Sequence, residues 1–106
     1  MPRFTRKDAE ALLPVVRPLV EDLKRRKAAY DRRRSEPVLR EINALIHELH
    51  ALGVEVKDLD LGLIDFRTLR GDREVYLCWR LGEGDRISYW HDLETGYGGR
   101  QPLDQN

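Results

Sequence analysis

Hydrophobic positions in the first half of the chain recur at spacings of three and four residues, the pattern of amphipathic helices. The first series consists of Leu12, Val16, Leu19, Val20 and Leu23. It is preceded by Thr5-Arg6-Lys7-Asp8, which has the form of a helix N-cap with an acidic residue three positions later. This pattern predicts helical structure from about Thr5 to about Arg33.

Two prolines, Pro14 and Pro18, interrupt the first series. Each removes a backbone donor and clashes with the preceding turn, so one kinked helix and two separate helices both fit. Proline is favourable at the first position of a helix. We therefore prefer a break near Leu13, with a second helix starting at Pro14.

The next series has the most regular helical periodicity in the chain and consists of Val38, Leu39, Ile42, Leu45, Ile46, Leu49 and Leu52. Ser35 can cap its start, Pro37 lies in its first turn, and Gly53 ends it. Because the link around Ser35 is short, we predict an antiparallel helical hairpin over residues 1–53, with its apolar stripes in contact.

After Gly53 the apolar period changes to two, which is typical of strands. Val54-Glu55-Val56 alternates, and residues 61–66 fit either a short strand or a loop. Residues 74–80 and 86–91 flank a glycine-rich turn and predict a β-hairpin. We expect one α+β domain over residues 1–106, in which the helical hairpin precedes a β-hairpin or three-stranded antiparallel sheet and a glycine-rich C-terminal loop.

Composition narrows the class of protein. The 106 residues carry no net charge, 36% are charged, and there is a single cysteine, Cys78. These features exclude a disulfide framework, a zinc cluster made of cysteines alone and, with no long apolar run, a transmembrane helix. We expect a cytoplasmic protein with no membrane partner, and the scarcity of thermolabile residues is similar to that of heat-adapted proteins.

Charge is distributed unevenly between the two halves. Residues 1–53 hold 12 basic and 8 acidic side chains, whereas residues 54–106 hold 7 and 11. The cations gather at the predicted tip of the helical hairpin, where candidate anion contacts are Lys24, Arg25, Arg32, Arg33 and Arg34. Such a cluster can bind nucleic-acid phosphates, contact the acidic half of another subunit, or simply be solvated, which is the commonest case.

Three segments carry a resemblance to a known family: Glu74-Val75-Tyr76-Leu77-Cys78-Trp79-Arg80, Tyr89-Trp90-His91-Asp92, and Gly96-Tyr97-Gly98-Gly99-Arg100-Gln101-Pro102-Leu103. With Phe4-Thr5, Leu12-Leu13-Pro14 and residues 53–58, they resemble an uncharacterised prokaryotic family catalogued as domain of unknown function 2203. In that family an acid, usually Glu, follows the Trp-His pair; here it is Asp92. The resemblance implies a shared fold and a functional end of the molecule, but no activity, because the family has none assigned.

One group of side chains could support ligand binding or chemistry where the last predicted strand meets the glycine-rich loop. The candidate ligand-binding residues are Trp90, His91, Asp92, Glu94 and Arg100. An imidazole beside carboxylates can ligate a divalent metal or act as an acid–base pair, and His91 and Asp92 are the metal candidates. An arginine near a glycine-rich segment can hold an anion. The alternative is that each of these residues only stabilises the fold.

A possible nucleophile and a possible metal-binding histidine pair are both better explained by structural roles. Cys78 lies in the middle of a predicted strand, so we expect a small buried hydrophobe, although pairing with a histidine across the hairpin would give a nucleophile. His47 and His50 are three residues apart on a helix, whereas zinc-protease helices place their histidines four apart. We expect both to lie on a solvated helix face.

The sequence assigns no activity, cofactor or catalytic residue. We favour an interaction or ligand-binding protein that self-associates through its helices, with a dimer as the first expectation and a small molecule or protein as the ligand. A metal-dependent or acid–base enzyme around His91, Asp92 and Arg100 is the first alternative. Non-specific nucleic-acid binding through the basic tip is the second.

Overall fold

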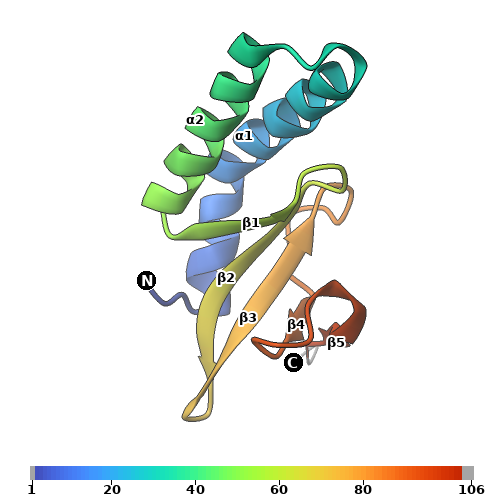
Figure 1. The fold of residues 1–106 in the computed structure, drawn as a ribbon. Coiled ribbons are helices and arrows are strands. Elements are labelled where there is room, and N and C mark those ends of the chain that lie inside the picture. The colour runs from blue at the N-terminus through green and yellow to red at the C-terminus, as the bar shows by residue number, and fades with distance from the viewer. Residues whose placement is uncertain (1, 104–106) are drawn as a thin grey trace.

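The computed structural model describes residues 2–103, which form two helices followed by an antiparallel sheet (Figure 1). Helix α1 spans Arg6–Arg33 and helix α2 spans Glu36–Ala51. The Thr5 hydroxyl caps α1 by accepting a hydrogen bond of 3.0 Å from the backbone N–H of Asp8, as the sequence predicts. The two helices lie side by side and antiparallel, so the predicted helical hairpin is confirmed.

The break predicted near Leu13 is not confirmed, because α1 is one helix that contains both Pro14 and Pro18. Both prolines lie on the exposed side of the helix, four residues apart. The carbonyl groups that lose their donors therefore lie on the side that water reaches. On the opposite side Leu13, Val16 and Val20 are buried, and their packing holds the helix together across the two prolines.

The sheet has five strands in the order β1-β2-β3-β4-β5, and each strand pairs with its neighbours antiparallel. Their bounds are β1 Val54–Asp58, β2 Leu63–Arg70, β3 Arg73–Arg80, β4 Tyr89–His91 and β5 Gln101–Pro102, with a single 3₁₀ turn at Tyr97–Gly99 before β5. The sequence predicted only two or three strands. Two strands were missed. The alternation of Val54-Glu55-Val56 was noted but not counted as a strand of the sheet, although it forms β1, and β5 is a two-residue edge strand containing a proline, which carries no alternating pattern.

The main core lies between α1 and one face of the sheet. Figure 1 shows α1 passing behind β1 and β2, while α2 packs beside the upper part of α1 and leads into β1. The sheet contributes Ile64 and Phe66 from β2 and Leu77 and Trp79 from β3. Because strand residues alternate, Asp65, Tyr76 and Cys78 point to the opposite face of the sheet.

None of the helices formed by residues 2–103 is both long and apolar enough to span a bilayer.

Candidate metal centre

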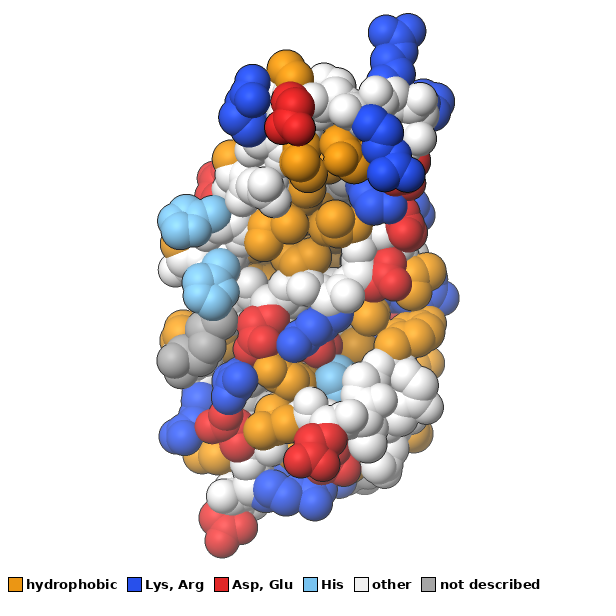
Figure 2. Space-filling model, in the orientation of Figure 1, with side chains coloured by type: hydrophobic (Ala, Val, Ile, Leu, Met, Phe, Trp, Pro, Cys, Tyr) orange, Lys and Arg blue, Asp and Glu red, His pale blue; other side chains and the backbone are white. Residues whose placement is uncertain are grey.

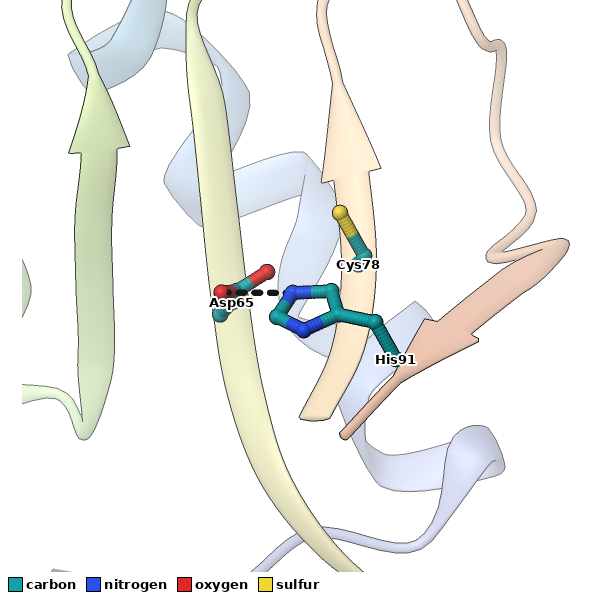
Figure 3. Close-up of side chains that lie close together, drawn as sticks. All are labelled: Asp65, Cys78 and His91. Atoms are coloured by element: carbon teal, nitrogen blue, oxygen red, sulfur yellow. Dashed lines mark hydrogen bonds and ion pairs between the residues drawn. The ribbon is translucent and has the colours of Figure 1, made fainter. Parts of the chain in front are cut away.

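Three side chains from three different strands meet on the face of the sheet that α1 does not cover. Asp65 of β2 lies directly opposite Cys78 of β3, and His91 of β4 lies opposite Tyr76, two residues before Cys78. One potential ligand atom of each residue lies within 4.8 Å of the other two. Figure 3 shows the imidazole of His91 reaching across β3 towards Asp65, with the sulfur of Cys78 beside the ring.

This cluster is buried although it lies on the outer face of the sheet. The exposed fractions are 1% for Asp65, 0% for Cys78 and 2% for His91. Beside it is a cavity of about 320 Å³ that Asp65 and His91 line together with Lys57, Leu93 and Tyr97. We call this cavity the His91 pocket. Leu93 and Tyr97 belong to the segment between β4 and β5, so the glycine-rich loop helps to enclose the cluster.

Two hydrogen bonds fix the orientation of the His91 ring. Nδ1 lies 2.7 Å from the backbone carbonyl oxygen of Asp92, and because a carbonyl only accepts, Nδ1 carries a proton. Nε2 lies 2.9 Å from Oδ2 of Asp65. A single proton therefore lies between Nε2 and the carboxyl group, whichever of the two holds it. Either arrangement makes the pair neutral overall, which is what its burial requires.

Only one of the two carboxylate oxygens of Asp65 has a hydrogen-bond partner. Burial raises the pKa of Asp65 above its usual value, and the neighbouring charge and hydrogen bond of His91 reduce this shift without cancelling it. The second oxygen, Oδ1, is buried and has no partner at hydrogen-bond geometry among residues 2–103. The nearby Cys78 thiol contributes only a weaker hydrogen-bonding interaction with the carboxyl group, which lowers the pKa of Asp65 less than His91 does. A buried carboxylate oxygen without a partner costs free energy and is rare in native proteins.

Cys78 is a poor nucleophile in this environment. Its burial and, second, the nearby Asp65 carboxylate raise the pKa of the Cys78 thiol to about 12, despite the opposing charge of Arg100. The side chain is therefore a neutral thiol near neutral pH, as expected for a small buried residue in a strand. A metal ion is the partner that would change this state, because a coordinating thiol loses its proton.

The three donors suit a borderline-soft transition metal. Zinc binds cysteine sulfur, histidine nitrogen and aspartate oxygen at about 2.0–2.3 Å, so ligand atoms a few ångströms apart can share one ion. The hydrogen bond from Nδ1 of His91 to a backbone carbonyl is the usual support of a metal-ligating histidine, and it leaves Nε2 as the donor. Calcium and magnesium favour sites made of oxygen atoms alone.

The other candidates predicted at this end of the molecule do not join the cluster. Asp92 contributes only its backbone carbonyl to it, and its carboxylate forms an ion pair of 3.1 Å with Arg73. Glu94 is exposed and forms no ion pair within residues 2–103. Trp90 points to the opposite side of β4, as alternation predicts, and there it lines a different cavity with Leu77.

Arg100 lies near the cluster but is bound to the protein itself. Its guanidinium group forms two hydrogen bonds of 2.6 and 2.7 Å with the Glu83 carboxylate and a third of 3.3 Å with the Cys78 backbone carbonyl. The rings of Tyr89 and Tyr97 lie 4.0 and 4.9 Å from it. Its ionic partner is therefore an internal carboxylate, and its second role is to hold the loop against β3.

The cations at the tip of the hairpin are spread along α1, and several neighbouring cations are paired. Arg25 and Arg26 both contact Asp22, Arg26 also contacts Glu41, and Lys27 contacts Asp31 and Asp60. Lys24, Arg32 and Arg33 are exposed, while Arg34 takes a left-handed conformation and lies over the ring of Tyr30. His47 and His50 are both exposed on α2, as predicted.

The sequence interpretation missed Asp65, the residue that completes the cluster. It lies within Leu63-Ile64-Asp65-Phe66, where an acid interrupts an apolar run. Aspartate is almost never fully buried unless it is paired, so this position was a signal for a buried partner. The identity of that partner depended on the register between β2 and β3, which the local pattern does not contain.

Comparison with known proteins places most of the chain in one family. Residues 24–103 match the family model described as "Uncharacterized conserved protein (DUF2203)". The match includes Asp65, Cys78 and His91. No curated protein and no solved structure matches the chain.

Proposed function

We propose that this chain, which belongs to the DUF2203 family, binds a divalent transition metal ion, with zinc as the best fit, through Asp65, Cys78 and His91. The observation that carries the proposal is the unpartnered Oδ1 of Asp65, buried beside a histidine whose Nε2 is already oriented. A metal ion supplies the missing partner for that oxygen.

Charge balance supports a divalent ion in particular. On metal binding, Cys78 becomes a thiolate, Asp65 a carboxylate and His91 a neutral imidazole. Two negative charges then meet one doubly positive ion, so the buried complex is neutral. Three protein ligands leave a fourth tetrahedral position open, as in catalytic rather than structural zinc sites. The adjacent His91 pocket offers space for water or a small ligand at that position.

Cobalt titration of the full chain tests the proposal. Co²⁺ added to protein stripped with a chelator should give the absorption of a tetrahedral site with a thiolate-to-metal charge-transfer band, and Zn²⁺ should displace it at one equivalent. Asp65→Asn, Cys78→Ser and His91→Gln should each weaken binding at least tenfold, about 1.4 kcal/mol. The matched control is His47→Gln with His50→Gln, which removes the exposed histidines and should leave binding unchanged. Binding that follows the control histidines instead would contradict the proposal.

We also propose that the helical hairpin self-associates as a dimer. Apart from the core, the hairpin carries partly buried apolar side chains, namely Leu12, Leu19, Tyr30, Val38, Leu45 and Ile46. Figure 2 shows a band of hydrophobic atoms over the two helices in the upper half of the molecule, flanked by charged side chains. A second copy of the same hairpin could cover this band in a four-helix arrangement.

A further inference from the structure

A second cavity, of about 400 Å³, lies on the helix side of the sheet, beyond the start of α1. Its walls are mainly apolar and include Phe4, Val75, Leu77 and Trp90. We call it the Trp90 pocket. It opens where the long β2–β3 hairpin extends past the first turn of α1, as Figure 1 shows, so no helix covers this part of the sheet.

The pocket has one cationic group without an ionic partner. Arg70, at the end of β2, lines the cavity, and its guanidinium carbon lies 4.4 Å from the centre of the Trp90 ring. Within residues 2–103 the Arg70 side chain forms no ion pair or hydrogen bond. By contrast, the other two arginines of the lining are paired: Arg3 with Glu74 at 3.1 Å and Arg6 with Glu10 at 3.6 Å. Arg70 is thus held in position by stacking while its N–H groups stay available.

The charged side chains around the rim determine what net charge a ligand of the pocket can carry. Arg70 supplies one positive charge, and the planar guanidinium matches a carboxylate. The Asp8 side chain also lines the pocket and is exposed, so it would repel an anion with two or more negative charges. The apolar side chains in the rest of the lining favour a ligand whose remaining part is hydrocarbon. Cavities of this size are at the lower end of the range for small-molecule sites.

We propose that the Trp90 pocket binds a medium-chain fatty acid, with the carboxylate on Arg70 and the hydrocarbon chain against Phe4, Leu77 and Trp90. This site is on the opposite face of the sheet from Asp65, Cys78 and His91 and does not depend on a metal ion.

Octanoate and Trp90 fluorescence test this site directly, because the indole lines the pocket. Titration of the metal-free full chain with octanoate should give a saturable change in emission that Trp90→Phe abolishes. Arg70→Gln should weaken octanoate binding about tenfold, and octanol, which lacks the charge, should bind the natural chain about tenfold more weakly. Arg40→Gln, an exposed arginine on α2, is the matched control and should not change binding.

Three results would overturn the proposal: no saturation with octanoate, equal affinity for octanoate and octanol, or an unchanged affinity in a folded Arg70→Gln protein. Octanoate affinity that falls as the protein concentration rises would show that a second copy of the chain competes for the pocket, and would also overturn the proposal. Asp65→Asn should bind octanoate as the natural chain does. The outcome for this site is therefore separate from the outcome for the metal site.

Discussion

The imidazole Nε2 of His91 lies 2.9 Å from a carboxylate oxygen of Asp65, 26 residues earlier in the chain, and neither side chain reaches solvent. A buried pair of this kind can serve the fold alone, or it can be the metal-free form of a coordination site. The two roles differ in how they respond to substitution.

Asp65→Asn should separate stability from metal binding. In the metal-free protein the amide of Asn can donate to Nε2 of a neutral His91, so we expect the free energy of unfolding to change by less than about 1 kcal/mol. Asp65→Ala removes the partner and leaves a void, and we expect a loss of about 2–3 kcal/mol. Urea denaturation in the presence of a chelator measures both. Equal losses for the two variants would argue against this account of the pair.

Cys78 should be protected from alkylation in the folded protein. The thiol is fully buried and its pKa is raised to about 12 by burial and by Asp65, so little thiolate forms near neutral pH. We expect iodoacetamide to react with folded protein at least about 100 times more slowly than with protein unfolded in urea. Mass spectrometry over time gives both rates. Rapid modification under native conditions would show that the site is open.

The Glu83–Arg100 pair should make stability depend on pH in the acid range. Burial alone would raise the pKa of Glu83, but hydrogen bonds from Arg100 and the Arg80 backbone outweigh it and hold this pKa below the usual 4.5. The ionised carboxylate therefore stabilises the fold above about pH 4.5, and this contribution is lost as pH falls towards the lowered pKa. In the Glu83→Gln variant, the free energy of unfolding should therefore fall less steeply as the pH is lowered.

The same variant should be less stable at neutral pH by about 3 kcal/mol, because it leaves a largely buried Arg100 without its counter-ion. Denaturation with urea at a series of pH values measures both effects. Glu94→Gln, at an exposed position in the nearby loop, is the control and should follow the natural chain. A Glu83→Gln protein with the same acid dependence as the natural chain would show that other carboxylates are responsible.

Pro14→Ala should stabilise the protein, because α1 is one continuous helix. The new backbone N–H can donate to the Glu10 carbonyl on an exposed face, which relieves a cost of about 3 kcal/mol for proline inside a helix. The greater freedom of the unfolded chain offsets about 0.4–1 kcal/mol, so we expect a gain near 2 kcal/mol. Thermal unfolding measures it. If a second helix began at Pro14, the substitution would instead be neutral or destabilising.

Dimer formation can be checked by light scattering on a size-exclusion column. We expect the mass of two chains at high protein concentration, and the mass of one chain for Leu45→Glu, which places a charge on the apolar band of the hairpin. Ala44→Glu, at the exposed neighbouring position, is the matched control and should remain dimeric. Circular dichroism establishes that both variants are folded. A natural chain that stays monomeric at high concentration would contradict the proposal.

The sequence by itself determined the helical hairpin and the faces of the central strands. Regular apolar spacing in residues 38–52 and alternation in residues 74–80 are local patterns, and they placed Cys78 on the face away from Trp79. The same reasoning put His91 and Trp90 on opposite sides of their strand. These features follow from the period of the backbone, which each segment carries on its own.

Only the tertiary structure decided which side chains meet. The pairing of β2 with β3 brings Asp65 opposite Cys78. The loop after β4 places Arg100 where its guanidinium group binds the Glu83 carboxylate rather than a ligand near His91. The continuity of α1 through its prolines was also settled by packing, because burial of Leu13 and Val16 overrides the local preference. Register and long-range contacts depend on how whole elements pack together, and no single segment encodes that.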